Sequence, residues 1–286
     1  ATLLENGRYY LRLRGEDVNG NLAEETVGVR VTGEAKLGLV QMSFVDLALD
    51  DIGIPLALVR SYDSRRASEK GDFGYGWELG LRTGRVQHNR LVGEDIVIDP
   101  GAGTFAEPFP CVRWEEQEFH FTEVRLSDSE YYVFRPVLVD LQPLSGSCSA
   151  DVQYEFVDGT NPGAVLGIVG NTTVRARAIG RIRASTFSTR GLLTDIATGD
   201  VYNPDHFRLT LLDGRKIDLT TQEGVIRFED RNGNSLSFTN GAVIHSSGRA
   251  LEIVRDREGR IDRVRDHAGR EIRYEYDGAG DLIGVT

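Results

Sequence analysis

Residues 269–282 read Gly-Arg-Glu-Ile-Arg-Tyr-Glu-Tyr-Asp-Gly-Ala-Gly-Asp-Leu, and a copy of this pattern occupies residues 248–261. The two copies align without a gap, so that Asp277 falls on Asp256. A repeat of about 20 residues is typical of proteins that stack one small structural unit on the next. Within each copy apolar residues alternate with charged ones, which predicts β-strands with one buried face.

Tight turns are predicted where an aspartate is followed three residues later by glycine, as at Asp256, Asp266 and Asp277. The aspartate can accept a hydrogen bond from the backbone two residues on, and glycine takes a positive φ without a steric clash. Spacings of 10 and 11 residues between these aspartates leave room for one short strand, which predicts β-hairpins. Strict alternation fails at Ile261 and Val264. This leaves two interpretations open, a β-bulge or a strand covered on both faces.

Parts of the same unit occur earlier, at residues 214–219 and 233–238, before the repeat becomes regular. The chain also has 33 glycines against 8 prolines, with many Asn-Gly and Asp-Gly steps that favour hairpin turns. We therefore predict an all-β fold in which antiparallel hairpins stack into a curved sheet.

Composition restricts the class of function. A formal net charge of −11 argues against a nucleic-acid-binding protein, because such a protein presents a basic face. No window of about 18 consecutive apolar residues exists, so no membrane span is predicted. The sequence has no Cys/His metal spacing, phosphate-binding loop or nucleophile elbow, and we expect no cofactor. The two cysteines, Cys111 and Cys148, are compatible with one disulfide or with two buried thiols.

Residues 1–33 predict two strands joined by a turn. This hairpin resembles the last two strands of an immunoglobulin-like or fibronectin-like sandwich, whose other strands would precede it. The chain begins in mid-pattern at Ala1, without an initiator methionine, so we expect it to be part of a longer protein.

Two further motifs lie between residues 34 and 90. The first, residues 55–64, reads Pro-Leu-Ala-Leu-Val-Arg-Ser-Tyr-Asp-Ser and predicts a strand with Pro55 at its start. The second, residues 73–77, reads Phe-Gly-Tyr-Gly-Trp. Its glycines let the backbone approach a neighbour closely while the large rings fill the space beneath.

Together with the Asp-x-x-Gly steps and the Tyr-x-Tyr-Asp of residues 274–277, these motifs resemble the Rhs/YD-repeat family. That family includes bacterial Rhs proteins, the shell of Tc toxins and teneurin-like proteins. The resemblance covers residues 34–90 and 205–286. It implies the end of an Ig-like domain at 1–33, an N-terminal plug-like β region at 34–204, and YD repeats at 205–286. The residues that carry the motifs are Pro55, Arg60, Tyr62, Phe73, Gly74, Gly76, Trp77, Asp256, Gly259, Gly269, Tyr274, Tyr276, Asp277 and Gly280.

The resemblance implies a non-catalytic role. In the family, YD repeats wind into a hollow β-shell that encloses a C-terminal toxin or forms a cell-surface adhesion scaffold. The expected partners are the remainder of the chain, namely further YD repeats and a C-terminal payload. Cell-surface glycans or proteins are the expected partners of an adhesion role. The expected location is extracellular or at the cell surface, with a bacterial source.

Two other functions are alternatives. An acidic β surface rich in Arg and Tyr suits an adhesion module for glycans or a partner protein. A glycosidase would need two carboxylates roughly 5–10 Å apart in a cleft. Glu116 and Glu118 share a predicted strand face with His120, which also makes a metal site conceivable, although an exposed acidic face is the simpler interpretation. His245 and Ser247 lie near aspartates, but a turn explains them better than a catalytic triad.

Overall fold

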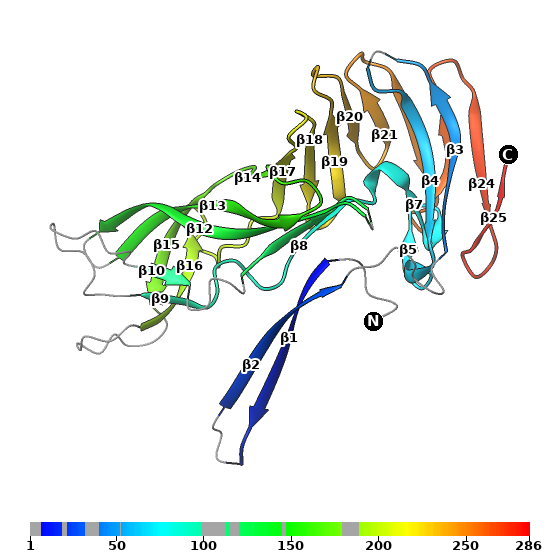
Figure 1. Cartoon of the computed structure of the whole chain (residues 1–286). Coiled ribbons are helices and arrows are strands. Elements are labelled where there is room, and N and C mark those ends of the chain that lie inside the picture. The colour runs from blue at the N-terminus through cyan, green and yellow to red at the C-terminus, as the bar shows by residue number, and fades with distance from the viewer. Residues whose placement is uncertain are drawn as a thin grey trace.

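The computed structural model describes residues 7–18, 22–31, 40–51, 53–98, 112–114, 120–127, 129–144, 147–178 and 189–286. Within these ranges the chain forms β-strands and two 3-10 turns, η1 (Ser64–Arg66) and η2 (Gly80–Arg82), and no α-helix. The strands pair in five antiparallel sheets (Figure 1). The predicted all-β class is confirmed.

The largest sheet has ten strands. In order across the sheet they are β14 (Val165–Ile168), β17 (His206–Thr210), β18 (Lys216–Thr220), β19 (Gly224–Glu229), β20 (Ser235–Phe238), β21 (Ala242–His245), β22 (Ala250–Arg255), β23 (Ile261–Arg265), β24 (Glu271–Tyr276) and β25 (Leu282–Val285). From β17 onward each strand pairs with the next one in the chain. The sheet curls into an open half-barrel (Figure 1), which confirms the predicted curved sheet of hairpins.

Turns of one geometry recur along this sheet. The backbone N–H of the first residue donates to the carbonyl of the fifth, and the N–H of a glycine at position four donates to the carbonyl of the first. The glycine φ angles lie between +83° and +98°, a region that a residue without Cβ enters at no steric cost. These turns span residues 211–215, 230–234, 245–249, 256–260, 266–270 and 277–281. The turns predicted at Asp256, Asp266 and Asp277 are among them.

A β-bulge explains why Ile261 and Val264 break the alternation. The register of β22 and β23 shifts between Val254 and Arg255, so that Asp262 is an extra residue on β23. Such a bulge changes which side chains face inward. Ile261 and Val264 are both fully buried as a result, and the bulge interpretation is confirmed. A similar register shift occurs where β24 pairs with β25.

A three-stranded sheet packs against the curled sheet. Its order is β3 (Gln41–Leu49), β4 (Leu56–Asp63) and β7 (Trp77–Leu79), and the short pair β5 (Lys70–Gly71) and β6 (Gly74–Tyr75) forms a separate sheet between β4 and β7 in the chain. Leu56, Leu58 and Phe73 are buried in one hydrophobic core with Leu251 and Val264 of the curled sheet. The segment with the first two motifs is therefore part of the core of the repeat region.

The third large element is an eight-stranded sheet. Its order is β10 (Val112–Trp114), β9 (Ile96–Ile98), β16 (Thr189–Asp195), β15 (Thr173–Ala178), β13 (Ser147–Gly159), β12 (Tyr131–Leu144), β11 (Thr122–Arg125) and β8 (Arg85–His88). One half has its own core around Ile96, Val152 and Leu193. The other half shares the first core through Val124 and Phe134.

The hairpin of β1 (Gly7–Glu16) and β2 (Leu22–Val31) forms a sheet of its own, with the two strands that the sequence predicts. Residues 19–21 of the predicted turn lie outside the described residues. Leu11 and Val27 pair across it and are 63% and 53% exposed. Arg30 donates a hydrogen bond of 3.2 Å to the hydroxyl of Tyr131, which links the hairpin to the eight-stranded sheet.

Candidate functional site

Asp46 connects two sequence motifs that lie far apart in the chain. A bulge between Val45 and Leu47 makes Asp46 an extra residue of β3, and bulges redirect side chains in this way. The Asp46 carboxylate accepts hydrogen bonds from Arg60 Nε at 2.9 Å and Nη2 at 3.1 Å. The hydroxyl of Tyr274 on β24 donates to Asp46 Oδ2 at 2.8 Å. Asp46 therefore joins the first motif to the repeat.

These three groups are removed from water. The side chains of Arg60 and Asp46 are only 10% and 6% exposed. Burial first, and then the charge of Asp46, raises the pKa of Tyr274 well above its ordinary value, so the hydroxyl stays protonated and remains a donor. When a buried ion pair loses one partner, the other charge is left uncompensated. Arg60 and Tyr274 therefore both depend on Asp46.

Aromatic rings pack around this ion pair. The guanidinium group of Arg60 lies 4.6 Å from the centroid of the Trp77 ring, within the range of cation–π attraction. The rings of Phe73 and Tyr274 lie 4.8 Å apart, in a tilted arrangement. Trp77 and Phe73 belong to the Phe-Gly-Tyr-Gly-Trp motif, so this motif contacts the repeat directly.

The glycine-rich loop, residues 71–77, needs its glycines for close approach. A Cβ at Gly74 would lie 2.5 Å from the carbonyl oxygen of Gly280, and a Cβ at Gly76 would lie 2.7 Å from the ring of Tyr62. The φ angles of Gly74 and Gly76 are also positive, at +92° and +71°. Any side chain at either position would push the loop away from its neighbours.

Hydrogen bonds fix this loop to the last hairpins. The carbonyl of Asp72 accepts the N–H of Ile261 at 2.8 Å, and its Oδ1 accepts Nη2 of Arg255 at 2.7 Å. The hydroxyl of Tyr276 donates to the carbonyl of Ile261 at 2.6 Å. The guanidinium group of Arg260 lies 4.2 Å from the centroid of the Tyr276 ring. The loop and the repeat thus form one packed joint.

The turn aspartates accept hydrogen bonds within their own turns. Asp256 Oδ1 accepts the N–H groups of Glu258 and Arg260, and Oδ2 accepts Arg260 Nε at 2.7 Å. Burial alone would raise the pKa of Asp256, but the hydrogen bonds from Arg260 lower it below its usual value. Three backbone N–H groups, led by that of Asp281, likewise lower the pKa of Asp277.

All of the motif residues except Pro55 fall into two groups. One group gathers at the joint: Arg60, Tyr62, Phe73, Gly74, Gly76, Trp77, Tyr274, Tyr276 and Gly280. Asp256, Gly259, Gly269 and Asp277 hold turns, and Pro55 is exposed immediately before β4. Asp46 binds both Arg60 and Tyr274, which suits a packing role. Asp46 gave no signal in the sequence, because only the bulge brings it to Arg60.

His245 and Ser247 do not form a catalytic triad. Ser247 Oγ lies 2.9 Å from His245 Nδ1 and donates to Asp51 Oδ2 at 2.8 Å. The Asp51 carboxylate faces the same ring nitrogen, at 3.4 Å, whereas a triad uses opposite nitrogens for the serine and the carboxylate. The N–H of Ser247 donates to His245 Nδ1 at 2.9 Å. Histidine therefore takes the place of the turn aspartate, and the turn interpretation is confirmed.

The acidic candidates for a metal or glycosidase site, Glu116 and Glu118, lie outside the described residues. Their predicted companion His120 is buried, with Nε2 at 3.1 Å from the carbonyl of Glu94 and its ring against Trp114. In the part of the chain that the structure describes, no group of three or more His, Cys, Asp or Glu could hold a metal ion.

Cys148 is disulfide-bonded and buried in the core of the eight-stranded sheet. The sequence has one other cysteine, Cys111, which lies outside the described residues. The Cys111–Cys148 pairing stays a prediction.

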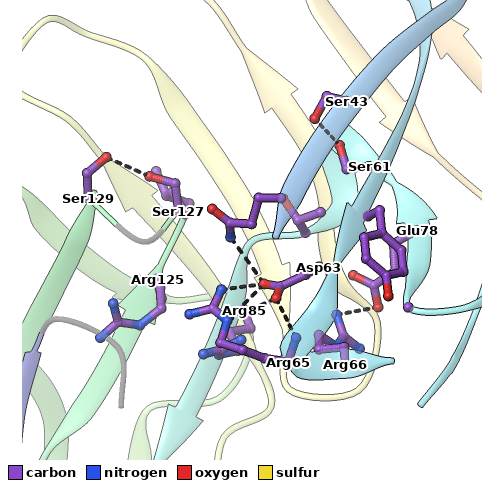
Figure 2. A pocket seen from close by; sticks show the side chains of 15 residues that line it. Ser43, Ser61, Asp63, Arg65, Arg66, Glu78, Arg85, Arg125, Ser127 and Ser129 are labelled. Carbon is purple, nitrogen blue, oxygen red and sulfur yellow. Dashed lines mark hydrogen bonds and ion pairs between the residues drawn. The ribbon is translucent and has the colours of Figure 1, made fainter. Parts of the chain in front are cut away.

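A cleft of about 300 Å³ opens where the first motif meets the eight-stranded sheet (Figure 2). It is lined by four arginines, two carboxylates and several hydroxyl groups: Arg65, Arg66, Arg85, Arg125, Asp63, Glu78, Ser43, Ser61, Ser127 and Ser129. These residues come from β3, β4, η1, β7, β8, β11 and the turn before β12. No single stretch of sequence contains the cleft, so no motif indicates it.

No known protein-family model and no curated protein matches this chain. Among the described residues, no helix is long and apolar enough to cross a membrane.

Proposed function

We propose that this chain is a non-catalytic, structural part of a large secreted Rhs/YD-repeat protein and forms the first part of its β-shell. The observation that carries the proposal is the hydrogen bond between Tyr274 and Asp46. Asp46 also pairs with Arg60 of the motif that precedes the repeats, so this motif and the motif of Tyr274 meet in one joint. A joint of this kind suits a scaffold in which a non-repetitive segment closes the first turns of a shell.

The recurrent turn supports the same proposal. Turns with one hydrogen-bond pattern add strands to a single sheet, and in repeat proteins each unit contacts chiefly its neighbours. The resulting curled sheet (Figure 1) has the shape expected of a wall around an interior.

Further repeats of the parent chain are the expected partner of β25. This strand lies at the edge of the ten-stranded sheet and carries Ile283, which is 65% exposed, and Val285, which is 37% exposed. An edge strand presents unpaired backbone groups and is a template for another strand. In the proposed parent protein, the completed shell encloses a C-terminal payload or acts as a scaffold at the surface of a bacterial cell.

Limited proteolysis of the full-length parent protein tests the enclosing shell. The segment that follows the repeats should resist protease in the intact shell. It should become cleavable when Asp46→Ala and Gly280→Val are combined, because both substitutions weaken the joint. Gly278→Ala serves as the control, since a Cβ at Gly278 meets no atom within 4 Å. Equal cleavage in all three proteins would contradict an enclosed payload.

Adhesion is a second candidate, and the hairpin of β1 and β2 favours it. Leu11 and Val27 form an exposed apolar pair on one face of this hairpin, where a partner would remove apolar surface from water. Immobilised chain should then retain cells, glycans or a partner protein, and Leu11→Ser should reduce that retention. If the chain retains no cell, glycan or protein, the adhesion role is contradicted and the scaffold role is the only one that remains.

A further inference from the structure

The cleft between β4 and β11 is less acidic than the chain as a whole. The whole chain has a formal net charge of −11, yet the cleft lining has four guanidinium groups against two carboxylates. Glu69 and Glu123, which lie outside the lining, form ion pairs with Arg66 and Arg125. Even when these two are counted, the charges of the cleft balance, in contrast to the excess of acid elsewhere.

Arg85 and Arg125 lie directly opposite each other on β8 and β11. Directly opposed residues of antiparallel strands have their side chains on the same face, with Cβ atoms about 5 Å apart. Arg125 already pairs with Glu123, and the remaining N–H donors of the two guanidinium groups are close enough for one bound anion to contact both. Both arginines line the cleft.

On the opposite side of the cleft, β4 and η1 present further arginines around the carboxylate of Asp63. Arg65 contacts Asp63 through its backbone N–H and its guanidinium group, as Figure 2 shows. Arg66 donates to Glu69 through Nε at 2.7 Å and pairs with Glu78 through Nη1. A guanidinium group has five N–H donors, and a bidentate contact with a carboxylate uses two of them. Arginines in ion pairs can therefore also bind the oxygens of an anion.

Hydroxyl groups complete the lining. The Oγ atoms of Ser127 and Ser129, in the turn before β12, lie 3.2 Å apart. Those of Ser43 and Ser61, on β3 and β4, lie 2.8 Å apart. A hydroxyl donates and accepts, so these pairs suit the polar substituents of a small molecule. Since one water needs only about 10–15 Å³ by a similar measure, the cleft of about 300 Å³ has room for more than a single ion.

We propose that this cleft binds an oxyanion group, a phosphate or sulfate, either as the free ion or as the ester of a small polar molecule. Arg85, Arg125 and Arg65 contact the oxyanion, and the serines contact the rest of an ester. Arginine suits this task because its planar fork matches the geometry of oxyanions. The inference is independent of the proposed scaffold role, since a shell wall and a ligand cleft on it can exist without each other.

Calorimetric titration of the chain tests the proposal with four probes: inorganic phosphate, sulfate, glucose 6-phosphate and glucose. The ionic strength is held constant with sodium chloride, so that general screening does not change between samples. We expect phosphate, sulfate and glucose 6-phosphate to bind and to raise the midpoint of thermal unfolding. If glucose 6-phosphate binds more tightly than phosphate, the ligand of the cleft is an ester. If the two affinities are equal, the ligand is the free ion. Binding of glucose alone, or of no probe, overturns the proposal.

Arg85→Gln removes one cleft charge and keeps a polar side chain, and it should weaken binding at least tenfold. Arg135→Gln is the matched control, because Arg135 is an exposed arginine that pairs with Glu155 on the same sheet and does not line the cleft. Equal affinities in these two variants would overturn the proposal, since binding would then lie elsewhere.

A second variant keeps all four arginines and addresses folding. Ser127→Ala combined with Ser129→Ala should weaken glucose 6-phosphate several-fold if the ester is the ligand. It should leave inorganic phosphate unaffected. A loss of both ligands, with an unchanged thermal midpoint in their absence, would overturn the assignment of the arginines as the oxyanion contacts.

Discussion

The hydroxyl of Tyr274 donates a hydrogen bond of 2.8 Å to the carboxylate of Asp46, a residue 228 positions earlier in the chain. Asp46 is also the counter-charge of Arg60. One carboxylate therefore holds a strand of the non-repetitive segment to a strand of the repeat. The stability of the curled sheet and the stability of the segment packed on it should be coupled through this contact.

Substitutions at the two ends of this contact should have unequal effects. Tyr274→Phe removes one hydrogen bond to a charged group and leaves the ion pair, so we expect a loss of about 1.5–3 kcal/mol. Asp46→Ala leaves the Arg60 charge buried without its partner, so we expect a loss of about 3–5 kcal/mol. Urea denaturation at pH 7 measures both. Equal losses would show that Asp46 is not the counter-charge on which Arg60 depends.

Glycine in the turns should be required for its backbone conformation. Gly259→Val should lower the free energy of unfolding by about 1–3 kcal/mol, because a β-branched residue is strained at a φ of +84°. A Cβ at Gly259 meets no atom within 4 Å, so contact plays no part. Gly280→Val should cost more, since its Cβ would lie 3.3 Å from the ring of Tyr75.

Gly278→Ala is the control for these turn variants. It has equally open space around a Cβ but no positive φ, so we expect no loss of stability. Thermal unfolding of the three variants separates the cases. An unchanged midpoint in Gly259→Val would mean that this glycine does not hold a left-handed turn in solution.

Acid should destabilise the repeat through its turns. The pKa values of Asp230, Asp256, Asp266 and Asp277 all lie below their ordinary value in the folded chain. The unfolded chain, with aspartate pKa values of about 4, therefore binds these protons more readily. Their contribution to stability is complete at a pH above the pKa of the unfolded chain. It is lost as the pH falls below that pKa toward the lower pKa values of the folded chain. Urea midpoints at pH 7, 5, 4 and 3 measure the loss.

Asp277→Asn tests the assignment of this pH dependence to the turns. Asparagine keeps an oxygen that can accept the backbone N–H groups of the turn, but it does not titrate. We expect the variant to be less stable than the parent at pH 7 and to lose less stability between pH 5 and pH 3. An identical acid dependence in both proteins would place the titrating groups elsewhere.

The Cys111–Cys148 disulfide should appear in peptide mapping without reductant as one linked peptide pair. Cys148 is disulfide-bonded and only 7% exposed. Reduction should lower the free energy of unfolding by about 2–5 kcal/mol, because the open chain has more conformations when unfolded. Calorimetry with and without reductant measures the change. Free thiols on both cysteines in the folded protein would contradict the bridge.

The turns could be predicted from the sequence because their hydrogen bonds are local. Asp277 binds N–H groups two to four residues away, so the spacing of aspartate and glycine contains the whole structural signal. The same locality explains why the turn at His245 was predicted without its mechanism. Nδ1 of His245 accepts the N–H of Ser247 there, as a carboxylate oxygen does in the aspartate turns. A rule based on the spacing of aspartate does not include histidine.

The joint and the cleft depend instead on contacts between distant segments. Asp46 reaches Arg60 and Tyr274 only because a bulge redirects it, and the position of a bulge in β3 is not written in the alternation of residues. Arg85 and Arg125 meet only because β8 and β11 pair in one register. A one-residue shift in that register would move them to different faces, so the cleft is a property of the folded chain alone.

The recurrent turns determine how a chain of this kind can change in length. One copy of the repeat runs from residue 248 to the start of the next copy at residue 269 and contains two strands and two turns. Two antiparallel strands return the backbone to the same border of the sheet. Duplication or loss of such a pair leaves every later strand running in its original direction. Gain or loss of a single strand would reverse them all. Gene segments that encode whole pairs are therefore the increments by which evolution can enlarge or shorten the protein without redesigning its core.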